Sequence, residues 1–339
     1  MGAHMERRTL LKSLAAAPLL SAPVLAGCAN RGSDTPEGTL NIGQISDSVA
    51  FFPLFIAEEN GYFKDEGITV GERPRLGTGA KVAAALKSGS IDLGAGVITD
   101  AFNLAQSEPG TRLVSSLVAE YYVDIVVGKN FDGPPVDAPV EERIKALRGK
   151  KIGITGPGSG TEALVTHLFG TVDMNPKRDA TLVNLGSAAT SAIGALDTGR
   201  VDALSFFQPI GQQVEAADKG SIYISPPEGD VPTLRGALHG VVFSTKELLD
   251  KKKDEVEGFQ RAMSRALGDI HGNPDEVRKL LKKYLKGTDE KALDALVPVL
   301  DAEVPPSPEI DPRSFATARA FHLDSGLVKH APEYVDLRY

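Results

Sequence analysis

Two similar junctions, far apart in the chain, constrain the fold of this sequence more than any other feature. The sequence ALKSGSIDLG at residues 85–94 and the sequence ALDTGRVDAL at residues 195–204 share one pattern. In each, a helix of small residues ends at a Ser-Gly or Thr-Gly pair, and an aspartate then opens a strand. A glycine after a helix is common in any protein, but both junctions occupy the same place in a series of short strands and helices. The sequence therefore predicts two similar α/β lobes.

Short apolar segments alternate with helical patterns through both halves of the chain. The predicted strands cover residues 40–45, 68–73 and 91–97 in the first half and residues 150–156, 180–186 and 201–207 in the second. The predicted helices cover residues 53–60, 77–89, 100–106, 158–169 and 187–199, followed by C-terminal helices at 246–271, 274–286, 289–300 and 311–324. This order predicts a mostly parallel sheet in each lobe, flanked by helices.

The extended stretch at residues 123–130 leads into residues 131–139, where a crossing between the lobes is expected. Residues 239–248 form a second extended stretch of similar character. We therefore assign residues 39–127 to the first lobe, residues 128–238 to the second lobe, and residues 239–339 to a return to the first lobe with C-terminal helices. Two crossings form a hinge about which two lobes can close.

The amino-terminal region carries the marks of an export signal. Residues 1–4 look like a cloning remnant, and residues 5–27 combine the basic pair Arg7-Arg8 with a short apolar run, as a signal peptide does. The paired arginines also fit a twin-arginine export signal. We therefore expect an exported protein.

The only cysteine of the chain, Cys28, ends the sequence LAGC, which resembles the bacterial lipobox. The resemblance implies cleavage before Cys28 and a lipid on its thiol, which would anchor the protein to the outer face of the cell membrane or in the periplasm. Residues 28–38 are polar, with glycine and proline, and are expected to form a flexible tether.

The composition excludes several other functions. A net charge of −8 argues against nucleic acid as a partner, since such binding needs clustered lysine and arginine. A catalytic cysteine is excluded, and the glycine-rich stretch at 153–163 lacks the Lys-Ser/Thr of a phosphate-binding loop. The histidines, which include His239 and His322, lack metal-like spacing and are expected to be ordinary surface or capping residues. We therefore expect neither an enzyme, nor a cofactor, nor a metal site.

Short polar loops recur between the end of a strand and the start of a helix. They cover residues 46–53, 77–79, 98–100, 156–161 and 186–188. Each leaves backbone N–H groups at the positive end of a helix dipole, which is a place where anionic groups bind. Each loop also fits simple helix capping. Five such loops on two lobes favour a ligand-binding cleft beyond the ends of the strands.

The stretches at 51–70 and 77–97 resemble solute-binding proteins of ABC importers, in the alkanesulfonate, nitrate, taurine and thiamine-pyrimidine-precursor class. The residues that carry the resemblance are the proline-led helix, the Gly-Tyr-Phe turn from Gly61, the Gly-x-Gly loop at 77–79 and the Ile-Asp junction at 91–92. The resemblance implies the two-lobed type II periplasmic-binding-protein fold, a small-molecule solute, an ABC permease as partner and a monomer. A pyrimidine-synthase branch of this family carries a cysteine-rich motif, and its absence from this sequence argues against that branch. An exported enzyme on the same scaffold and a ligand-sensing domain are the alternatives.

The loops and their neighbours supply the candidate ligand-binding residues. These are Ser46, Asp47, Ser48, Phe51, Phe52, Gly77, Thr78, Gly79, Thr99, Asp100, Tyr122, Ser159, Gly160, Thr161, Ser187, Phe207 and Gln208. Asp47 and Asp100 fit a ligand nitrogen and a helix cap equally well. Aromatic residues occur in adjacent pairs, and neighbours on a strand point to opposite faces, so at most one of each strand pair can face the cleft. We expect a small organic solute: a sulfonate, a carboxylate, or a related aromatic or zwitterionic compound.

Overall fold

The computed structural model describes residues 36–326 and 328–339. The predicted cloning remnant, signal peptide and lipidated Cys28, and all but the end of the tether, lie outside the described residues. None of the helices in the described part of the chain is both long enough and apolar enough to span a membrane.

The first lobe is built on a four-stranded sheet. Its strands are β2 (Ile42–Gln44), β4 (Leu93–Val97), β11 (Gly240–Thr245) and β5 (Thr111–Val118), in that spatial order. β2 and β4 are parallel, and β11 is antiparallel to both β4 and β5, so β11 alone opposes the common direction. The predicted strand at 68–73 is reduced to β3 (Thr69–Val70), which pairs with β1 (Thr39–Leu40) outside this sheet.

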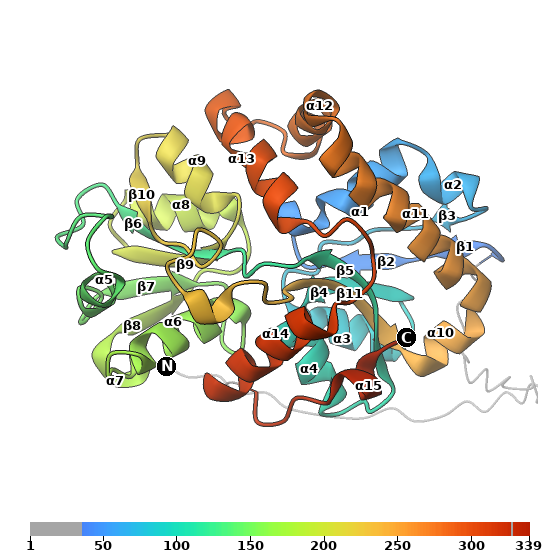
Figure 1. The fold of residues 1–339 in the computed structure, drawn as a ribbon, viewed down its shortest axis with the longest axis horizontal. Helices are drawn as coiled ribbons and strands as arrows, with labels where there is room; N and C mark the ends of the chain where they lie inside the picture. Colours follow the sequence, from blue (N-terminus) through green and yellow to red (C-terminus); the bar gives the residue numbers. More distant parts are fainter. Residues whose placement is uncertain (1–35, 327) are drawn as a thin grey trace, which may run out of the picture. The chain divides into compact units, whose positions relative to one another are not determined.

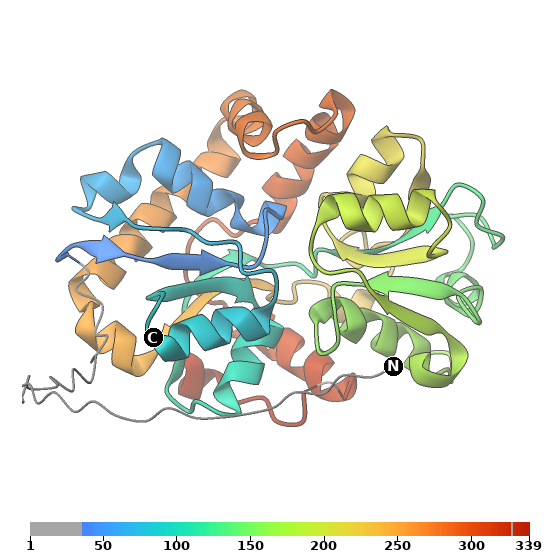
Figure 2. The ribbon, with the colours of Figure 1, turned by 180° about the vertical axis from the view of Figure 1, so that it is seen from behind.

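The second lobe is built on a five-stranded sheet (Figures 1 and 2). Its strands are β10 (Gly220–Ile224), β6 (Val123–Gly128), β9 (Ala203–Phe207), β7 (Lys151–Ile154) and β8 (Thr181–Asn184), in that spatial order. β7 is parallel to β8 and β9, whereas β6 is antiparallel to β9 and β10. Each lobe therefore has a mostly parallel sheet with one reversed strand, and the predicted α/β, two-lobed fold is confirmed.

Helices cover both faces of the sheets and form the C-terminal region. Their bounds are α1 (Phe52–Glu59), α2 (Tyr62–Asp65), α3 (Gly79–Ser88), α4 (Ile98–Ala105), α5 (Val140–Lys145), α6 (Gly160–Gly170), α7 (Pro176–Asp179), α8 (Ala189–Asp197), α9 (Ile210–Ala216), α10 (Lys246–Lys251), α11 (Lys253–Gly272), α12 (Pro274–Tyr284), α13 (Glu290–Glu303), α14 (Pro312–Asp324) and α15 (Tyr334–Leu337), with 3-10 turns η1 (Val49–Phe51) and η2 (Pro232–Leu234). The single helix expected at 246–271 is interrupted at Lys252, whose backbone leaves the helical region at φ −130° and ψ 41°.

The repeated junction has one structural basis in both lobes. Asp92 precedes β4 and accepts a hydrogen bond from the Asn41 N–H at 2.8 Å, next to β2. Asp202 precedes β9 and accepts one from the Lys151 N–H at 2.7 Å, at the start of β7. In each lobe the carboxylate thus ties the start of one strand to the neighbouring strand.

The boundary between the lobes differs from the predicted one. Residues 123–127 were assigned to the first lobe, but they form most of β6, which pairs with β9 and β10 of the second sheet. The first crossing is therefore the short segment 119–122, and the second lies just before β11. Extended backbone alone does not reveal which sheet a strand joins, because the pairing partners come from distant parts of the chain.

The C-terminal helices contact both lobes rather than only the first. α13 packs against α9 of the second lobe, and α14 packs against α6 and η2 (Figure 1). The carbonyl of Glu303, at the end of α13, accepts the Ala119 N–H at 2.9 Å, and the carbonyl of Ser314 on α14 accepts the Leu238 N–H at 3.0 Å. Both crossings are therefore held by backbone hydrogen bonds to these helices.

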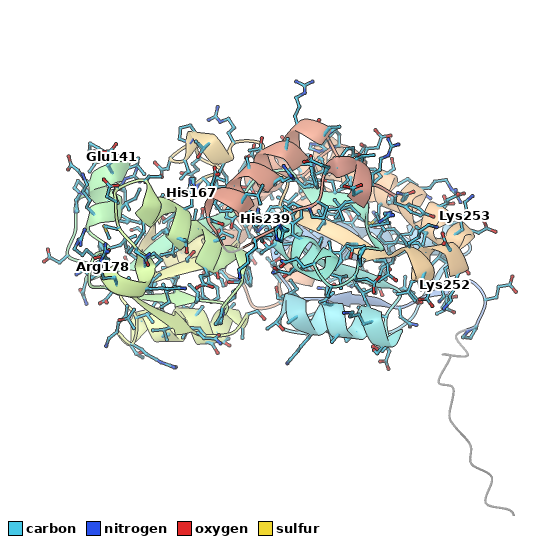
Figure 3. The ribbon with its side chains drawn as sticks, turned by 90° about the horizontal axis from the view of Figure 1, so that it is seen from below. Glu141, His167, Arg178, His239, Lys252 and Lys253 are labelled. Carbon is cyan, nitrogen blue, oxygen red and sulfur yellow. The ribbon has the colours of Figure 1, made fainter. Side chains whose placement is uncertain are left out.

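The two repeated aspartates should differ in their contribution to stability. Asp92 is buried and forms an ion pair of 2.9 Å with Lys252, which Figure 3 labels, whereas Asp202 is more exposed. We expect Asp92→Ala to lower the free energy of unfolding by about 2–4 kcal/mol, because Lys252 loses the carboxylate that neutralises its charge and keeps only the Thr39 carbonyl. We expect Asp202→Ala to lower it by about 1 kcal/mol. Urea unfolding of both variants measures this difference, and equal losses would contradict the assigned role of burial.

Candidate ligand-binding cleft

A cleft of about 470 Å³ lies between the two lobes, within the range of small-molecule sites. It is lined by Ile45, Ser46, Phe51, Gly77, Thr78, Gly79, Ala80, Ala83, Ala84, Lys87, Val97, Asp100, Asn103, Leu104, Ser107, Tyr122, Val123, Thr155, Gly156, Pro157, Gly158, Ser159, Gly160, Thr161, Phe207 and His239. Both lobes therefore contribute lining residues to one cleft.

Two helix faces form the first-lobe wall. α3 contributes Ala80, Ala83, Ala84 and Lys87, and the α4 segment contributes Asp100, Asn103, Leu104 and Ser107. Both sets follow the i, i+3, i+4, i+7 spacing of one helix face. The small alanine side chains leave room for a solute. Sequence analysis limited to the loops missed these helix residues, although their i, i+3, i+4, i+7 spacing is visible in the sequence.

Asp100 lies against the first turn of α3. Its Oδ2 accepts the Val97 N–H at 2.9 Å, which caps α4. A Cβ placed on Gly79 would lie only 1.7 Å from Asp100 Oδ1, so the second glycine of the Gly-x-Gly loop is required to make room for the carboxylate. The first glycine, Gly77, has φ +84°, a backbone conformation that favours glycine. Burial raises the pKa of Asp100 to about 6, which leaves the group mostly ionised at neutral pH.

The start of α6 forms the second-lobe wall. Ser159 caps the helix by accepting the Glu162 N–H, and its hydroxyl lies 2.7 Å from that of Thr161. The Thr155 N–H donates to Thr161 Oγ1 at 3.0 Å. The predicted loop is therefore a connected set of hydroxyls. This loop is joined to the first lobe by a hydrogen bond in which Asn103 Nδ2 donates to the Gly158 carbonyl at 3.5 Å.

The predicted aromatic pairs divide between cleft and core. Tyr122 and Phe207 line the cleft, while their neighbours Tyr121 and Phe206 are fully buried outside it. The Tyr121 hydroxyl donates to the Gly160 carbonyl at 2.5 Å, at the start of α6. Phe51 is a third aromatic side chain in the cleft.

His239 was expected to be an ordinary surface or capping residue, and this expectation is wrong. It is 1% exposed, lines the cleft, and lies edge-on to Tyr121 and Tyr122 where the lobes meet (Figure 3). Its Nδ1 has no hydrogen-bond partner among the described residues. Burial, with a smaller effect of His322, lowers the pKa of His239 well below its usual value, so the ring is neutral. A histidine at a lobe crossing has no local sequence signal.

The expectation for His322 is also wrong. Its side chain is fully buried, and burial lowers its pKa to about 4. The ring Nδ1 donates to the Ala318 carbonyl at 2.7 Å, so Nε2 accepts the Thr99 hydroxyl at 2.6 Å. Thr99, a predicted ligand-binding residue, is thereby committed to the core.

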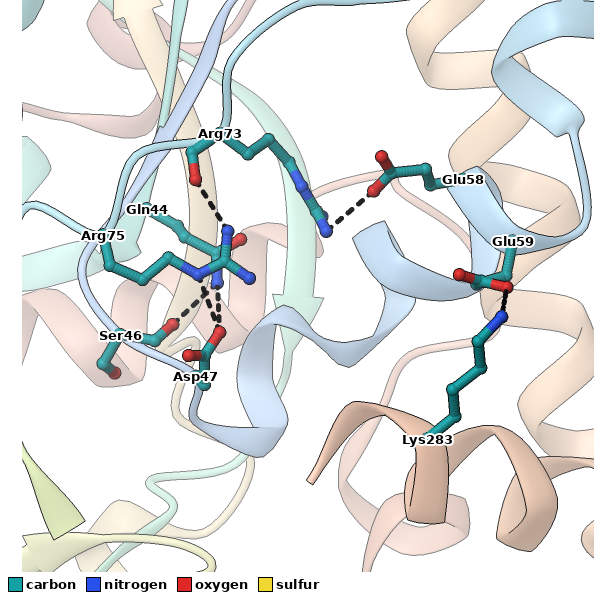
Figure 4. Close-up of polar contacts among 8 residues, drawn as sticks. All are labelled: Gln44, Ser46, Asp47, Glu58, Glu59, Arg73, Arg75 and Lys283. Atoms are coloured by element: carbon teal, nitrogen blue, oxygen red, sulfur yellow. Dashed lines mark hydrogen bonds and ion pairs between the residues drawn. The ribbon is translucent and has the colours of Figure 1, made fainter. Parts of the chain in front are cut away.

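Five further candidates do not line the cleft. Asp47 points to Arg75 Nε at 2.7 Å (Figure 4), and Ser48 is buried, with its carbonyl accepting the Tyr284 hydroxyl. Phe52 is fully buried against Tyr284. Ser187 stays beside the cleft, where a Cβ on Gly77 would lie 4.0 Å from its Oγ, and Gln208 is 2% exposed. One loop can contain both residues that line the cleft and residues that do not, because successive side chains in a loop point in different directions.

Figure 4 also shows what surrounds the 46–48 loop. Gln44 Nε2 donates to the Ser46 carbonyl at 2.7 Å, and Arg73 pairs with Glu58 at 2.8 Å. Lys283 pairs with Glu59 nearby. The Gln44 hydrogen bond holds the Ser46 carbonyl, while the carboxylate of its neighbour Asp47 accepts a hydrogen bond from Arg75.

At the first crossing lies a buried set of three polar residues: Asp124, Gln208 and Glu303. Gln208 Nε2 donates to Glu303 Oε1 at 3.0 Å, and the Ser225 hydroxyl donates to Asp124 Oδ1 at 2.7 Å. Asp124 Oδ2 and Gln208 Oε1 are buried acceptors without a partner in the described part of the chain. Burial raises the pKa of Asp124 to about 7 and that of Glu303 to about 8, so the set retains protons near neutral pH.

A model for the family described as NMT1/THI5 like matches residues 48–277. The chain belongs to this family. The predicted family resemblance is thereby confirmed. The chain is also 32% identical over 152 residues to the 4-amino-5-hydroxymethyl-2-methylpyrimidine phosphate synthase of Aspergillus parasiticus. That match covers 43% of this chain and 40% of the synthase, so it spans less than half of either protein.

Solved structures share the fold of this NMT1/THI5-like chain over nearly its whole length. The alkanesulfonate-binding protein SsuA from Xanthomonas axonopodis pv. citri, bound to MOPS, has a TM-score of 0.68 and 19% identity, covering 88% of this chain and 95% of SsuA. A protein from Bordetella bronchiseptica RB50 has a TM-score of 0.74 and 23% identity, covering 89% of this chain and 95% of its own. These similarities establish the periplasmic-binding-protein fold.

The buried carboxyls should make stability depend on pH. Their pKa values in the folded state exceed those of an unfolded chain, so the folded state binds more protons between about pH 5 and pH 8, and the free energy of unfolding falls as the pH rises. We expect Glu303→Gln to reduce this fall by about 1 kcal/mol or more, because glutamine has no proton to lose. Urea unfolding across the pH range measures the slope.

A matched control is Glu141→Gln on the exposed face of α5, at the residue labelled in Figure 3. It should leave the slope unchanged. A Glu303→Gln profile parallel to that of the unsubstituted protein would contradict the assignment of a buried proton to this set.

Proposed function

We propose that this protein is a membrane-anchored solute-binding lipoprotein of an ABC importer. It holds a small organic solute in the cleft between its lobes and delivers it to a permease. The observation that carries the proposal is the cleft itself, in which the first turns of α3, α4 and α6 and three aromatic side chains from both lobes surround one space of solute size.

The cleft suits capture by closure. Asn103 and Gly158 approach each other across it at 3.5 Å, and two crossings join the lobes. Closing two lobes on a solute removes water from its polar contacts and buries its apolar part. A micromolar complex requires about −8 kcal/mol, which several hydrogen bonds and apolar burial together can supply.

Binding without chemical conversion is part of the proposal. It is supported by the likeness to the alkanesulfonate-binding protein and by the presence of a single cysteine, which excludes a cysteine-rich motif. The match to a pyrimidine phosphate synthase supports the alternative of an exported enzyme. Mass spectrometry of solutes recovered after incubation with the purified protein separates the two, since a converted product would defeat the binding-only proposal.

Filling the cleft should abolish solute binding without unfolding the protein. Ala83 lies on the cleft face of α3, and Ala83→Phe places a ring in the space for the solute. We expect at least about a tenfold loss of affinity for any solute recovered with the protein, measured by calorimetry. The exposed Ala217→Phe is the control for the added ring, and equal affinities for the two variants would place the solute elsewhere.

The anchor is proposed from the lipobox-like sequence LAGC, which ends at Cys28. In producing cells, Cys28→Ser should move the protein from the membrane fraction to the medium or the periplasmic fraction, because no thiol remains for the lipid. Fractionation and immunoblotting give the result. Continued membrane association of the variant would exclude this anchor and leave the binding function standing.

A further inference from the structure

We propose that the cleft selects a solute with a positively charged or amidine-type N–H group, and that Asp100 is the residue that recognises it. This inference rests on the proposed function, since it requires the solute to lie between the lobes. It replaces the expectation of a simple sulfonate or carboxylate, and it still admits a zwitterion whose cationic group faces Asp100.

The geometry of Asp100 leaves acceptor capacity facing the cleft. Oδ2 accepts one hydrogen bond, from the Val97 N–H at 2.9 Å, and Oδ1 has no hydrogen-bond partner in the described part of the chain. An ionised carboxylate offers about four acceptor positions. A fork of two N–H groups, as in an amidine, can therefore bind both oxygens without displacing the cap of α4.

The same carboxylate occupies the place where an anionic solute would be expected. Asp100 Oδ1 lies within 1.7 Å of the Cβ position of Gly79, directly at the first turn of α3. Asp100 is itself in the first turn of α4. The positive ends of both first-lobe helices are therefore already compensated by a protein carboxylate, and a second negative group there would be repelled.

The described second-lobe residues that line the cleft include no lysine or arginine that could attract an anionic solute. At the start of α6, the Glu162 carboxylate accepts the Gly158 N–H at 2.7 Å, so this helix end also carries an acidic side chain. Among the described residues that line the cleft, Lys87 is the one lysine or arginine. It is exposed, and its Nζ donates to Ser107 Oγ at 3.1 Å. The remaining base in the cleft, His239, is neutral.

The aromatic side chains fit a planar cationic group. Phe51, Tyr122 and Phe207 line the same cleft as Asp100. Aromatic faces attract cations through their quadrupole, and the attraction grows when water is excluded. The cleft thus combines one half-buried carboxylate with aromatic surface.

Two probes with the same ring and opposite head groups test the proposal: benzamidine and benzenesulfonate. Calorimetry and thermal shift are measured with the full chain and with Asp100→Asn, in which the amide oxygen can still accept the Val97 N–H. Glu162→Gln removes a carboxylate at the other helix end and serves as the matched control. We expect the unsubstituted protein to bind benzamidine at least about tenfold more tightly than benzenesulfonate, and Asp100→Asn to lose about tenfold or more for benzamidine alone.

The comparison of the two probes on the unsubstituted protein needs no variant, so the proposal stays testable if Asp100→Asn fails to fold. Equal or tighter binding of benzenesulfonate, no binding of benzamidine, or an Asp100→Asn affinity equal to that of Glu162→Gln would each overturn it. Benzenesulfonate bound in a manner that Ala83→Phe abolishes would overturn the selection of cations and leave the proposed cleft function intact. Benzamidine binding unaffected by Ala83→Phe would overturn both.

Discussion

The reversed strand in each sheet determines where Tyr122 and His239 lie in the cleft. β6 and β11 are the strands by which the chain enters a new lobe, and each runs against its sheet. The residue just before each strand therefore lies where the lobes meet. Tyr122 precedes β6 and His239 precedes β11, and both line the cleft. The hydrogen bonds from α13 and α14 to the crossings keep this arrangement in place.

Close approach at glycine is the second constraint, and at the cleft it occurs at the start of α3 and at the start of α6. Asp100 occupies the space of a side chain at Gly79, while a Cβ on Gly160 would lie 3.2 Å from both the Tyr121 hydroxyl and His239 Cε1. The starts of α3 and α6 thus face polar side chains that belong to the protein. A helix start with such a neighbour differs electrostatically from one that is open to a ligand, although their local sequences look the same.

Three buried polar residues lie beside the first crossing. Asp124, Gln208 and Glu303 are each at most 5% exposed, and they join the second sheet to the end of α13. Carboxyls buried to this degree keep a proton to avoid an unpaired charge. The same residues therefore affect both the stability of the protein and the geometry of the first crossing.

The sequence by itself determined the α/β class, the two lobes and the strand-opening aspartates, because these follow from short-range periodicity and from a pattern that occurs twice. It also placed Ser46, the 77–79 loop, Asp100, Tyr122, the start of α6 and Phe207 at the cleft, since the ends of parallel strands meet at one edge. Only the tertiary structure decided that β6 joins the second sheet and that His239 enters the cleft. It alone showed that Thr99 forms a hydrogen bond with His322, Asp47 with Arg75 and Gln208 with Glu303. These outcomes depend on residues far away in the chain. The local sequence does not specify which distant side chain will form a hydrogen bond with a polar group or fill a space.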